Sequence, residues 1–156
     1  MCQRFIVAFG CMLMGIPSLA VAQKTEKQNC TVTIVSPKPG QTVTEDAQVE
    51  GTASIPSGSF LWVFAHRKGL QLWWPQGGGP ASISIRGNWQ VVVTFGTERD
   101  TGREFEIATA VVDPNTNEQL RGWVKRAEES GRYPGFQFPS ITAGCKITDV
   151  TVTKTR

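Results

Sequence analysis

Residues 48–55 read QVEGTASI, and this stretch decides the fold class. Small or apolar residues occupy every second position from Val49 to Ile55, and polar residues occupy the positions between them. A β-strand with this pattern packs one face on a core and exposes the other to water. The stretch therefore predicts a β-strand in a layered β-structure, with one face of the strand buried in the core and the other exposed to solvent.

Similar short runs, rich in Val, Ile, Thr and aromatic residues and separated by turn residues, recur along the chain. This arrangement is typical of an all-β sandwich. Gly87-Asn88 is expected to form a two-residue hairpin turn. The further strands expected are Thr31–Val35, Phe60–Arg67, Leu70–Trp74, Ala81–Arg86, Trp89–Phe95, Phe105–Val112 and Lys146–Lys154.

Residues 116–130, TNEQLRGWVKRAEES, break the β pattern. Leu120, Trp123, Val124 and Ala127 recur at helical spacing, which predicts one apolar helix face. Thr116 and Gln119 have the spacing of a capping box, and Gly131 is a natural stop. Strands 60–67 and 105–112 are apolar on both faces, so we expect the helix to lie on the outside of their sheet.

The N-terminal residues have the features of an export signal. Arg4 precedes a mostly apolar run, Phe5–Leu19, and Ala20-Val21-Ala22 forms a small-residue cleavage site. We predict a signal peptide over residues 1–22, a flexible arm over 23–29 and one domain over 30–156, in a secreted or periplasmic protein with no membrane span after cleavage. An uncleaved anchor and a lipoprotein acylated at Cys11 are the alternatives.

Charge and cysteine usage are consistent with export. The chain of 156 residues has 16 Lys+Arg against 13 Asp+Glu, with no basic block or stripe, so a nucleic-acid partner is not expected. Cys30 and Cys145 remain after signal cleavage, and such a pair is predicted to form a disulfide. With one histidine, His66, no metal site and no cofactor are expected.

The pattern I34-x-x-P37-x-x-G40-x-x-V43, followed by V49-x-G51, resembles the start of bacterial immunoglobulin-like modules of exported and cell-surface proteins. The resemblance covers residues 31–55 and the final strand. It implies an immunoglobulin-like β-sandwich whose first and last strands run parallel and adjacent, which would bring Cys30 and Cys145 together. The helix inserted before the last strand and the tryptophan-glycine stretch depart from the pattern. The resemblance implies little about function.

Residues 66–80, HRKGLQLWWPQGGGP, contain the candidate ligand-binding residues. Neighbouring strand side chains point to opposite faces, so Leu70, Leu72 and Trp74 are expected in the core, with Trp73 on the other face. An aromatic ring beside amides and a glycine loop suits a sugar ring or a peptide. The alternative places Trp73 under the helix, against Trp123 or Trp62. The candidates are His66, Arg67, Trp73, Pro75, Gln76, Gly77 and Gly78.

Catalytic and metal signals are weaker. His66 could act as a general base, and Glu104 and Glu106 share a strand face, but the loop arginines nearby favour ion pairs. Residues 113–118 lack the glycine of a calcium loop and are interpreted as a turn. The aromatic and proline-rich stretch 133–139 is expected to pin the chain between the helix and the last strand, and it could also form one wall of a groove with Trp73.

The sequence therefore predicts a non-catalytic module that binds another macromolecule, a protein or a glycan, at the cell envelope or outside the cell. A carbohydrate- or peptidoglycan-binding module that uses Trp73 and the glycine loop is the alternative. A small hydrolase is the third hypothesis.

Overall fold

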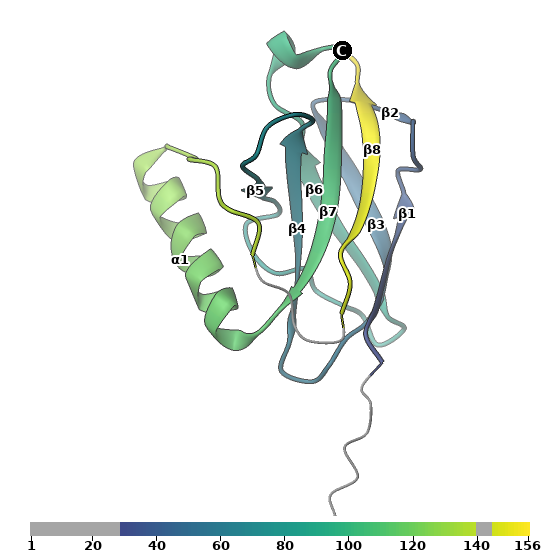
Figure 1. Ribbon diagram of the computed structural model, residues 1–156, viewed down its shortest axis with the longest axis vertical. Helices are drawn as coiled ribbons and strands as arrows, with labels where there is room; N and C mark the ends of the chain where they lie inside the picture. Colours follow the sequence, from purple (N-terminus) through teal and green to yellow (C-terminus); the bar gives the residue numbers. More distant parts are fainter. Residues whose placement is uncertain (1–28, 140–144) are drawn as a thin grey trace, which may run out of the picture.

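The computed structural model describes residues 29–139 and 145–156 and contains two β-sheets and an α-helix (Figure 1). The predicted signal peptide and all but the last residue of the predicted arm lie outside the described residues. The elements are β1 (Thr31–Ser36), β2 (Thr42–Val43), β3 (Asp46–Ser54), β4 (Phe60–Arg67), β5 (Trp74–Pro75), β6 (Asn88–Thr94), the 3-10 turn η1 (Glu98–Asp100), β7 (Glu104–Val112), α1 (Pro114–Ser130) and β8 (Thr148–Lys154).

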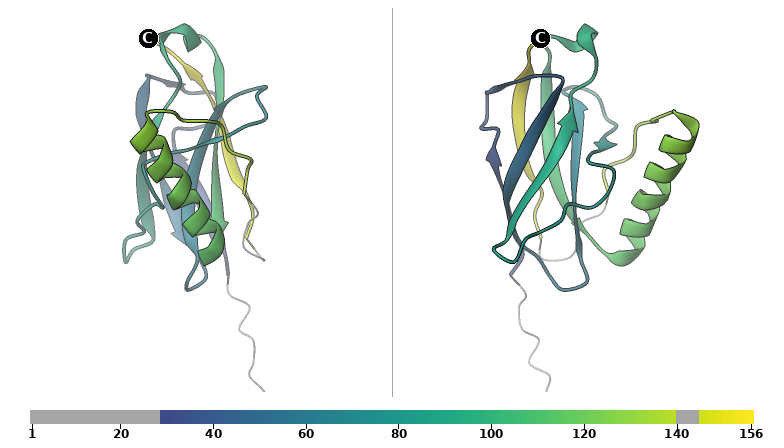
Figure 2. Two further views of the ribbon diagram at one scale, coloured as in Figure 1. Left: turned by 90° about the vertical axis from the view of Figure 1, so that its left-hand side faces the viewer. Right: turned by 180° about the vertical axis from the view of Figure 1, so that it is seen from behind.

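The sheets form two layers around a shared core (Figures 1 and 2). One sheet has the order β1-β3-β6 and the other the order β2-β8-β7-β4-β5. Neighbouring strands are antiparallel except for β2 and β8, which are parallel. The mainly-β, two-layer architecture predicted from the sequence is confirmed.

The alternation in residues 48–55 places β3 as expected. Val49 is fully buried between the sheets, while its polar neighbours Gln48 and Glu50 face outward. Gly51 lies where β3 passes close to β1, and a Cβ there would collide with the backbone oxygen of Thr33 and the ring of Trp89. Close packing of the backbone therefore explains this glycine within the strand.

A disulfide joins Cys30, just before β1, to Cys145, ahead of β8. This bond was predicted and is confirmed. The strand arrangement around it differs in detail from the expectation, because β1 pairs with β3 in the smaller sheet and the short strand β2 makes the parallel pairing with β8. The Oγ1 of Thr148 also donates to the carbonyl of Val32 at 2.9 Å, so β1 and β8 lie side by side near the disulfide.

The apolar face of α1 packs on the outer side of the larger sheet. Side chains along β4 alternate between the two hydrophobic clusters: Leu61 and Val63 face the other sheet, whereas Trp62 and Phe64 face α1. The indole Nε1 of Trp62 donates to Oδ1 of Asn117 at 3.0 Å within this contact. The helix residues in the cluster are Leu120, Trp123, Val124 and Ala127.

The start of α1 differs from the prediction. Asp113 is the N-cap, and its carboxylate accepts a hydrogen bond from the backbone nitrogen of Thr116 at 2.7 Å. Thr116 therefore lies inside the first turn, and the predicted capping box with Gln119 is wrong. Pro114 occupies the first helical position, where a backbone N–H would have no hydrogen-bond partner within the helix, so proline is tolerated there. Gly131 ends the helix in the left-handed conformation, as expected.

Two predicted strands are largely absent. The strand expected over 70–74 is reduced to β5, and residues 81–86 are not a strand. The chain turns after β5 at Gly77 and Gly78, which have positive φ angles of 72° and 69°. Beyond this turn it forms no regular ladder with β4, but the nitrogen of Ala81 donates a single hydrogen bond to the oxygen of Leu61. The turn before β6 is also earlier than predicted, because the nitrogen of Gly87 already donates back to the oxygen of Ser84.

Within the described ranges, 29–139 and 145–156, no helix is both long enough and apolar enough to cross a lipid bilayer.

Candidate functional site

A cavity of about 590 Å³ opens between the C-terminal half of α1 and the edge of the sandwich, which we call the helix-side groove. In Figure 1, α1 stands beside the sandwich on the side of β5, the edge strand of the larger sheet. The groove is lined by Ala65, His66, Arg67, Leu70, Trp74, Pro75, Gln76, Gly77, Gly78, Val92, Thr94, Gly96, Asp100, Phe105, Trp123, Val124, Glu128 and Tyr133.

Three aromatic residues from separate segments line the groove. The half-buried indole of Trp74 is fixed by a hydrogen bond from its Nε1 to the backbone oxygen of Tyr133, at 2.8 Å. Tyr133 is 56% exposed, and its ring meets the edge of Trp123, which is 8% exposed. The groove is therefore an apolar, aromatic-lined hollow with a polar rim, the usual character of a binding site.

Gln76 connects the two sheets at the base of the groove. Its Nε2 donates to the oxygen of Trp74 at 3.0 Å, and its Oε1 accepts from the backbone nitrogen of Thr94 at 2.9 Å. Both ends of the amide thus have partners within the protein. Gln76, one of the predicted ligand-binding residues, lines the groove, but its amide holds β5 against β6.

Trp73 lies behind the groove. Its ring stacks on His66, with ring centroids 3.7 Å apart, and meets the edge of Phe138 at 5.0 Å. Its backbone pairs with Phe136 in both directions, from each nitrogen to the other's oxygen. Trp73 is therefore packed among side chains, as in the alternative interpretation, although its stacking partners are His66 and Phe138 and not Trp123 or Trp62.

The burial expected for the residues around Trp73 is wrong. Leu70 and Leu72 are 39% and 37% exposed, and Trp74 is only half-buried in the groove wall. The expectation assumed a regular strand, in which side chains alternate. Residues 70–73 are not in a strand, so the alternation does not apply to them.

His66 is enclosed at the end of β4 and is 6% exposed. Its Nε2 lies 2.7 Å from Oε2 of Glu106, directly opposite on β7. Its Nδ1 is buried, and none of the described residues offers it a hydrogen bond. The carboxylate on one side and the Trp73 ring on one face fix the imidazole, which itself lines the groove.

The two carboxylates that share a face of β7, Glu104 and Glu106, bond to different side chains. Glu104 accepts from Lys68 at 3.1 Å, whereas Glu106 bonds His66. Arg67 pairs with Asp100 at 3.2 Å. The pKa of Asp100 lies below its ordinary value because the backbone N–H of Thr97 donates to the carboxylate and Arg67 lies beside it.

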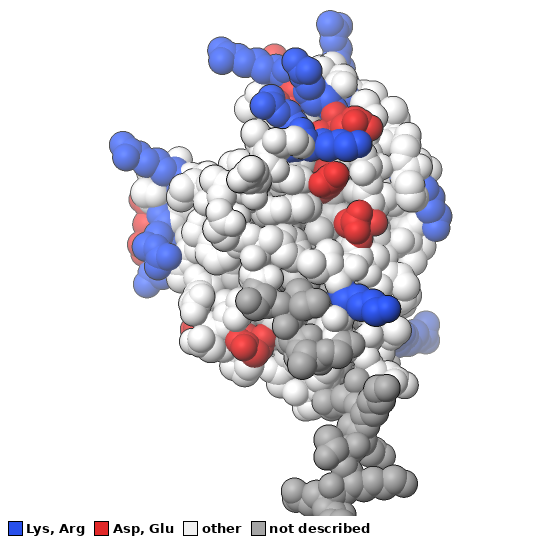
Figure 3. Space-filling model, viewed as in Figure 1, with Lys and Arg blue, Asp and Glu red and all other residues white. Residues whose placement is uncertain are grey.

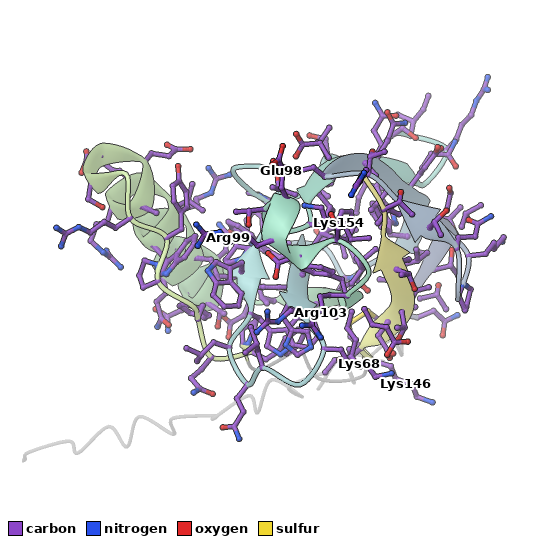
Figure 4. All side chains as sticks on the ribbon, turned by 90° about the horizontal axis from the view of Figure 1, so that it is seen from above. Lys68, Glu98, Arg99, Arg103, Lys146 and Lys154 are labelled. Carbon is purple, nitrogen blue, oxygen red and sulfur yellow. A yellow bond between two sulfur atoms is a disulfide. The ribbon has the colours of Figure 1, made fainter. Side chains whose placement is uncertain are left out.

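A charged end of the molecule lies next to the groove. Lys and Arg side chains gather there with Asp and Glu side chains between them (Figure 3). Viewed from above, Lys68 and Arg103 lie toward β8, and Glu98 and Arg99 project from η1 (Figure 4). Lys68, Arg103 and Glu104 line a second hollow at this end. Because opposite charges alternate there, no surface of a single sign forms.

No family model matches the chain, and no curated protein proved similar to it.

The structure brings six of the seven predicted ligand-binding residues to the groove: His66, Arg67, Pro75, Gln76, Gly77 and Gly78. The sequence reasoning missed Trp74, Trp123 and Val92 as groove residues. The sequence pattern could have identified Val92, because it is an apolar residue on the exposed face of β6, between the polar residues Gln90 and Thr94. Tyr133 belongs to the stretch for which a groove wall was the alternative interpretation, and it does line the groove.

Proposed function

We propose that this protein is an exported, immunoglobulin-like module without catalytic activity that binds another protein through the helix-side groove. The observation that carries the proposal is the aromatic lining of the groove, which joins Trp74, Trp123 and Tyr133 from three segments of the chain. Buried aromatic pockets with a polar rim are where protein partners insert anchoring side chains. The predicted export signal and the disulfide support an extracytoplasmic location.

The aromatic geometry favours an inserted side chain over a sugar ring. A sugar usually stacks on an open, flat aromatic face, whereas Trp123 is nearly buried and Trp74 is half-buried in the wall. Only the ring of Tyr133, among the three, is well exposed. An apolar side chain can enter between these rings and remove their remaining surface from water.

A displayed library of short random peptides, selected on the immobilised protein, tests the proposal. We expect it to yield peptides with an aromatic or large aliphatic residue at a fixed position. Tyr133→Ala should weaken their binding about 30-fold, the effect of losing an aromatic anchor. This variant keeps the backbone oxygen that accepts from Trp74, so the pocket wall remains in place.

Ile85→Ala is the matched control, because Ile85 is fully exposed at the turn before β6 and does not line the groove. It should bind the selected peptides as the wild type does. Failure to select any peptide, or equal binding to Tyr133→Ala, would overturn the proposal. A saccharide from a parallel glycan panel that changes tryptophan fluorescence in the wild type but not in Trp74→Ala would favour the carbohydrate alternative.

A further inference from the structure

β6 is an edge strand of the smaller sheet, with β3 as its neighbour in that sheet. The backbone groups of the odd-numbered residues of β6 point toward β3. The nitrogen of Phe95 donates to the oxygen of Glu45, and Val93 and Val91 lie two and four residues before Phe95, so their backbone groups point the same way. Successive backbone groups along a strand point in opposite directions. The N–H and C=O groups of Gln90 and Val92 therefore point away from β3, and the described residues provide no hydrogen-bond partner for them.

The protein itself covers both ends of this edge. At one end, the nitrogen of Asn88 donates to Oγ of Ser84 at 3.0 Å, and its oxygen accepts from the nitrogen of Ser84. At the other end, the nitrogen of Thr94 donates to the side chain of Gln76. Gln90 and Val92 are left open between these caps, which limits any added strand to a short segment in one register.

The open edge borders the helix-side groove. Val92 and Thr94 of β6 line the groove together with Trp123 and Glu128 of α1. Seen from behind, β6 lies on the side of its sheet that is nearer to α1 (Figure 2). A segment that hydrogen-bonds Gln90 and Val92 would therefore place alternate side chains toward the aromatic lining.

Charge further defines what the groove accepts. Among the ionisable residues that line the groove, Arg67 pairs with Asp100, and His66 hydrogen-bonds Glu106. Glu128 lines the same groove, and no ion pair is found for it among the described residues. A ligand with a cationic side chain near Glu128 would complement this remaining negative charge.

We propose that the protein partner binds as an extended peptide segment added to the free edge of β6. The segment hydrogen-bonds the backbone of Gln90 and Val92, inserts an aromatic or aliphatic side chain beside Trp74 and Tyr133, and places a Lys or Arg near Glu128. Strand addition gains affinity from main-chain bonds and specificity from side-chain pockets. This inference rests on the proposed function of the groove and identifies the class of its partner.

Peptides selected from the display library are the probe. Val92→Pro removes an N–H that does not bond β3, and Val92→Ala is the matched control that shortens the side chain but keeps the N–H. We expect Val92→Pro to weaken peptide binding at least about tenfold relative to Val92→Ala, the loss expected for hydrogen bonding at a desolvated interface. Thermal unfolding of both variants shows whether the fold is kept.

A second measurement does not depend on folding of the proline variant. In the wild type, saturation with a selected peptide should slow amide hydrogen exchange at Gln90 and Val92 at least about tenfold, because these amides become hydrogen-bonded. The amide of Ile85, outside the groove, is the internal reference and should not change.

Glu128→Gln should weaken selected peptides that contain Lys or Arg about threefold, and Glu129→Gln should not, since Glu129 lies one position further on and pairs with Lys125. Peptides that lose affinity for Tyr133→Ala but leave exchange at Gln90 and Val92 unchanged would overturn strand addition and leave the groove function standing. A library that yields no peptide would overturn both proposals.

Discussion

Asp100 holds together the loop between β6 and β7 at the rim of the groove. Its carboxylate accepts from the backbone nitrogen of Thr97 at 3.0 Å and from Arg67 at 3.2 Å. Both contacts favour the ionised form and hold its pKa below the ordinary value of 3.8. A single ionised side chain thus links β4 to the loop that borders the groove.

The lowered pKa of Asp100 predicts a pH-dependent contribution to stability. A carboxylate with a lower pKa in the folded state stabilises the fold at pH values above its unfolded pKa, and this contribution is lost as the pH falls through the folded value. In urea unfolding, the wild type should therefore exceed Asp100→Asn in free energy of unfolding at about pH 6, and the difference should shrink toward about pH 2. A difference that stays constant across this range would contradict the assignment.

For single residues, Trp73 and Trp74 show what the sequence pattern could not predict, namely which of the two side chains lines the groove. The pattern identified the tryptophan-glycine stretch as important, and the glycines and Gln76 do line the groove. The choice between the two tryptophans depended on a regular strand over 70–74, whereas the backbone of Trp73 pairs with Phe136 and β5 begins only at Trp74. Trp73 stacks on His66, a contact between separate segments that local periodicity does not specify.

The docking of α1 depends on a buried polar contact as well as on apolar packing. Asn117 is 2% exposed and accepts the indole hydrogen of Trp62, which is fully buried. A buried donor that loses its acceptor destabilises the fold by the full free energy of its removal from water, because no hydrogen bond offsets it. This hydrogen bond fixes the helix relative to β4, and so fixes one wall of the groove.

We predict that Asn117→Ala lowers the free energy of unfolding by about 1–3 kcal/mol, because the indole N–H of Trp62 is left without a partner. The same substitution in a Trp62→Phe background should have a smaller effect, since no N–H remains to be satisfied. Denaturant unfolding of the wild type, both single variants and the double variant measures this coupling. An equal cost in both backgrounds would show that the hydrogen bond does not stabilise the helix contact.

Elements with strong periodicity were predicted well. Phe60–Arg67 forms β4 with the predicted bounds, and the helical stripe corresponds to α1. The segment 81–86 was not a strand, although Ala81 and Ile83 do pack against the core. Its apolar alternation reflects burial against the core, with a backbone hydrogen bond to β4 from Ala81 alone among residues 81–86, and a sequence pattern does not distinguish this from a regular ladder.

On the scale of the whole molecule, the disulfide between Cys30 and Cys145 spans a sequence separation of 115. A crosslink of this length restricts the unfolded chain strongly, and the chain-entropy model assigns it about 4–5 kcal/mol. Cys145 is buried in the core between the sheets and Cys30 packs against it, but most of that core and the whole contact of α1 with β4 are formed by other residues. The fold is therefore expected to persist without the disulfide but with a lower stability.

We predict that Cys30→Ser/Cys145→Ser lowers the free energy of unfolding by about 4–5 kcal/mol, and that adding reductant to the wild type has a similar effect. Urea titrations followed by tryptophan fluorescence measure both. Reductant should leave the double variant unchanged, which is the control. A wild type with the same unfolding midpoint in the oxidised and reduced forms would contradict the prediction.

The same bond makes nearly all of the sandwich and its helix one covalent ring, from residue 30 to residue 145. An endoprotease that cuts once at any exposed site within this ring, the glycine-rich turn included, opens the ring without separating two fragments. The nicked protein would migrate as a single band on a denaturing gel until a thiol is added. In a compartment with extracellular proteases, a molecule of this kind can be cleaved at a loop and still keep both walls of its groove together.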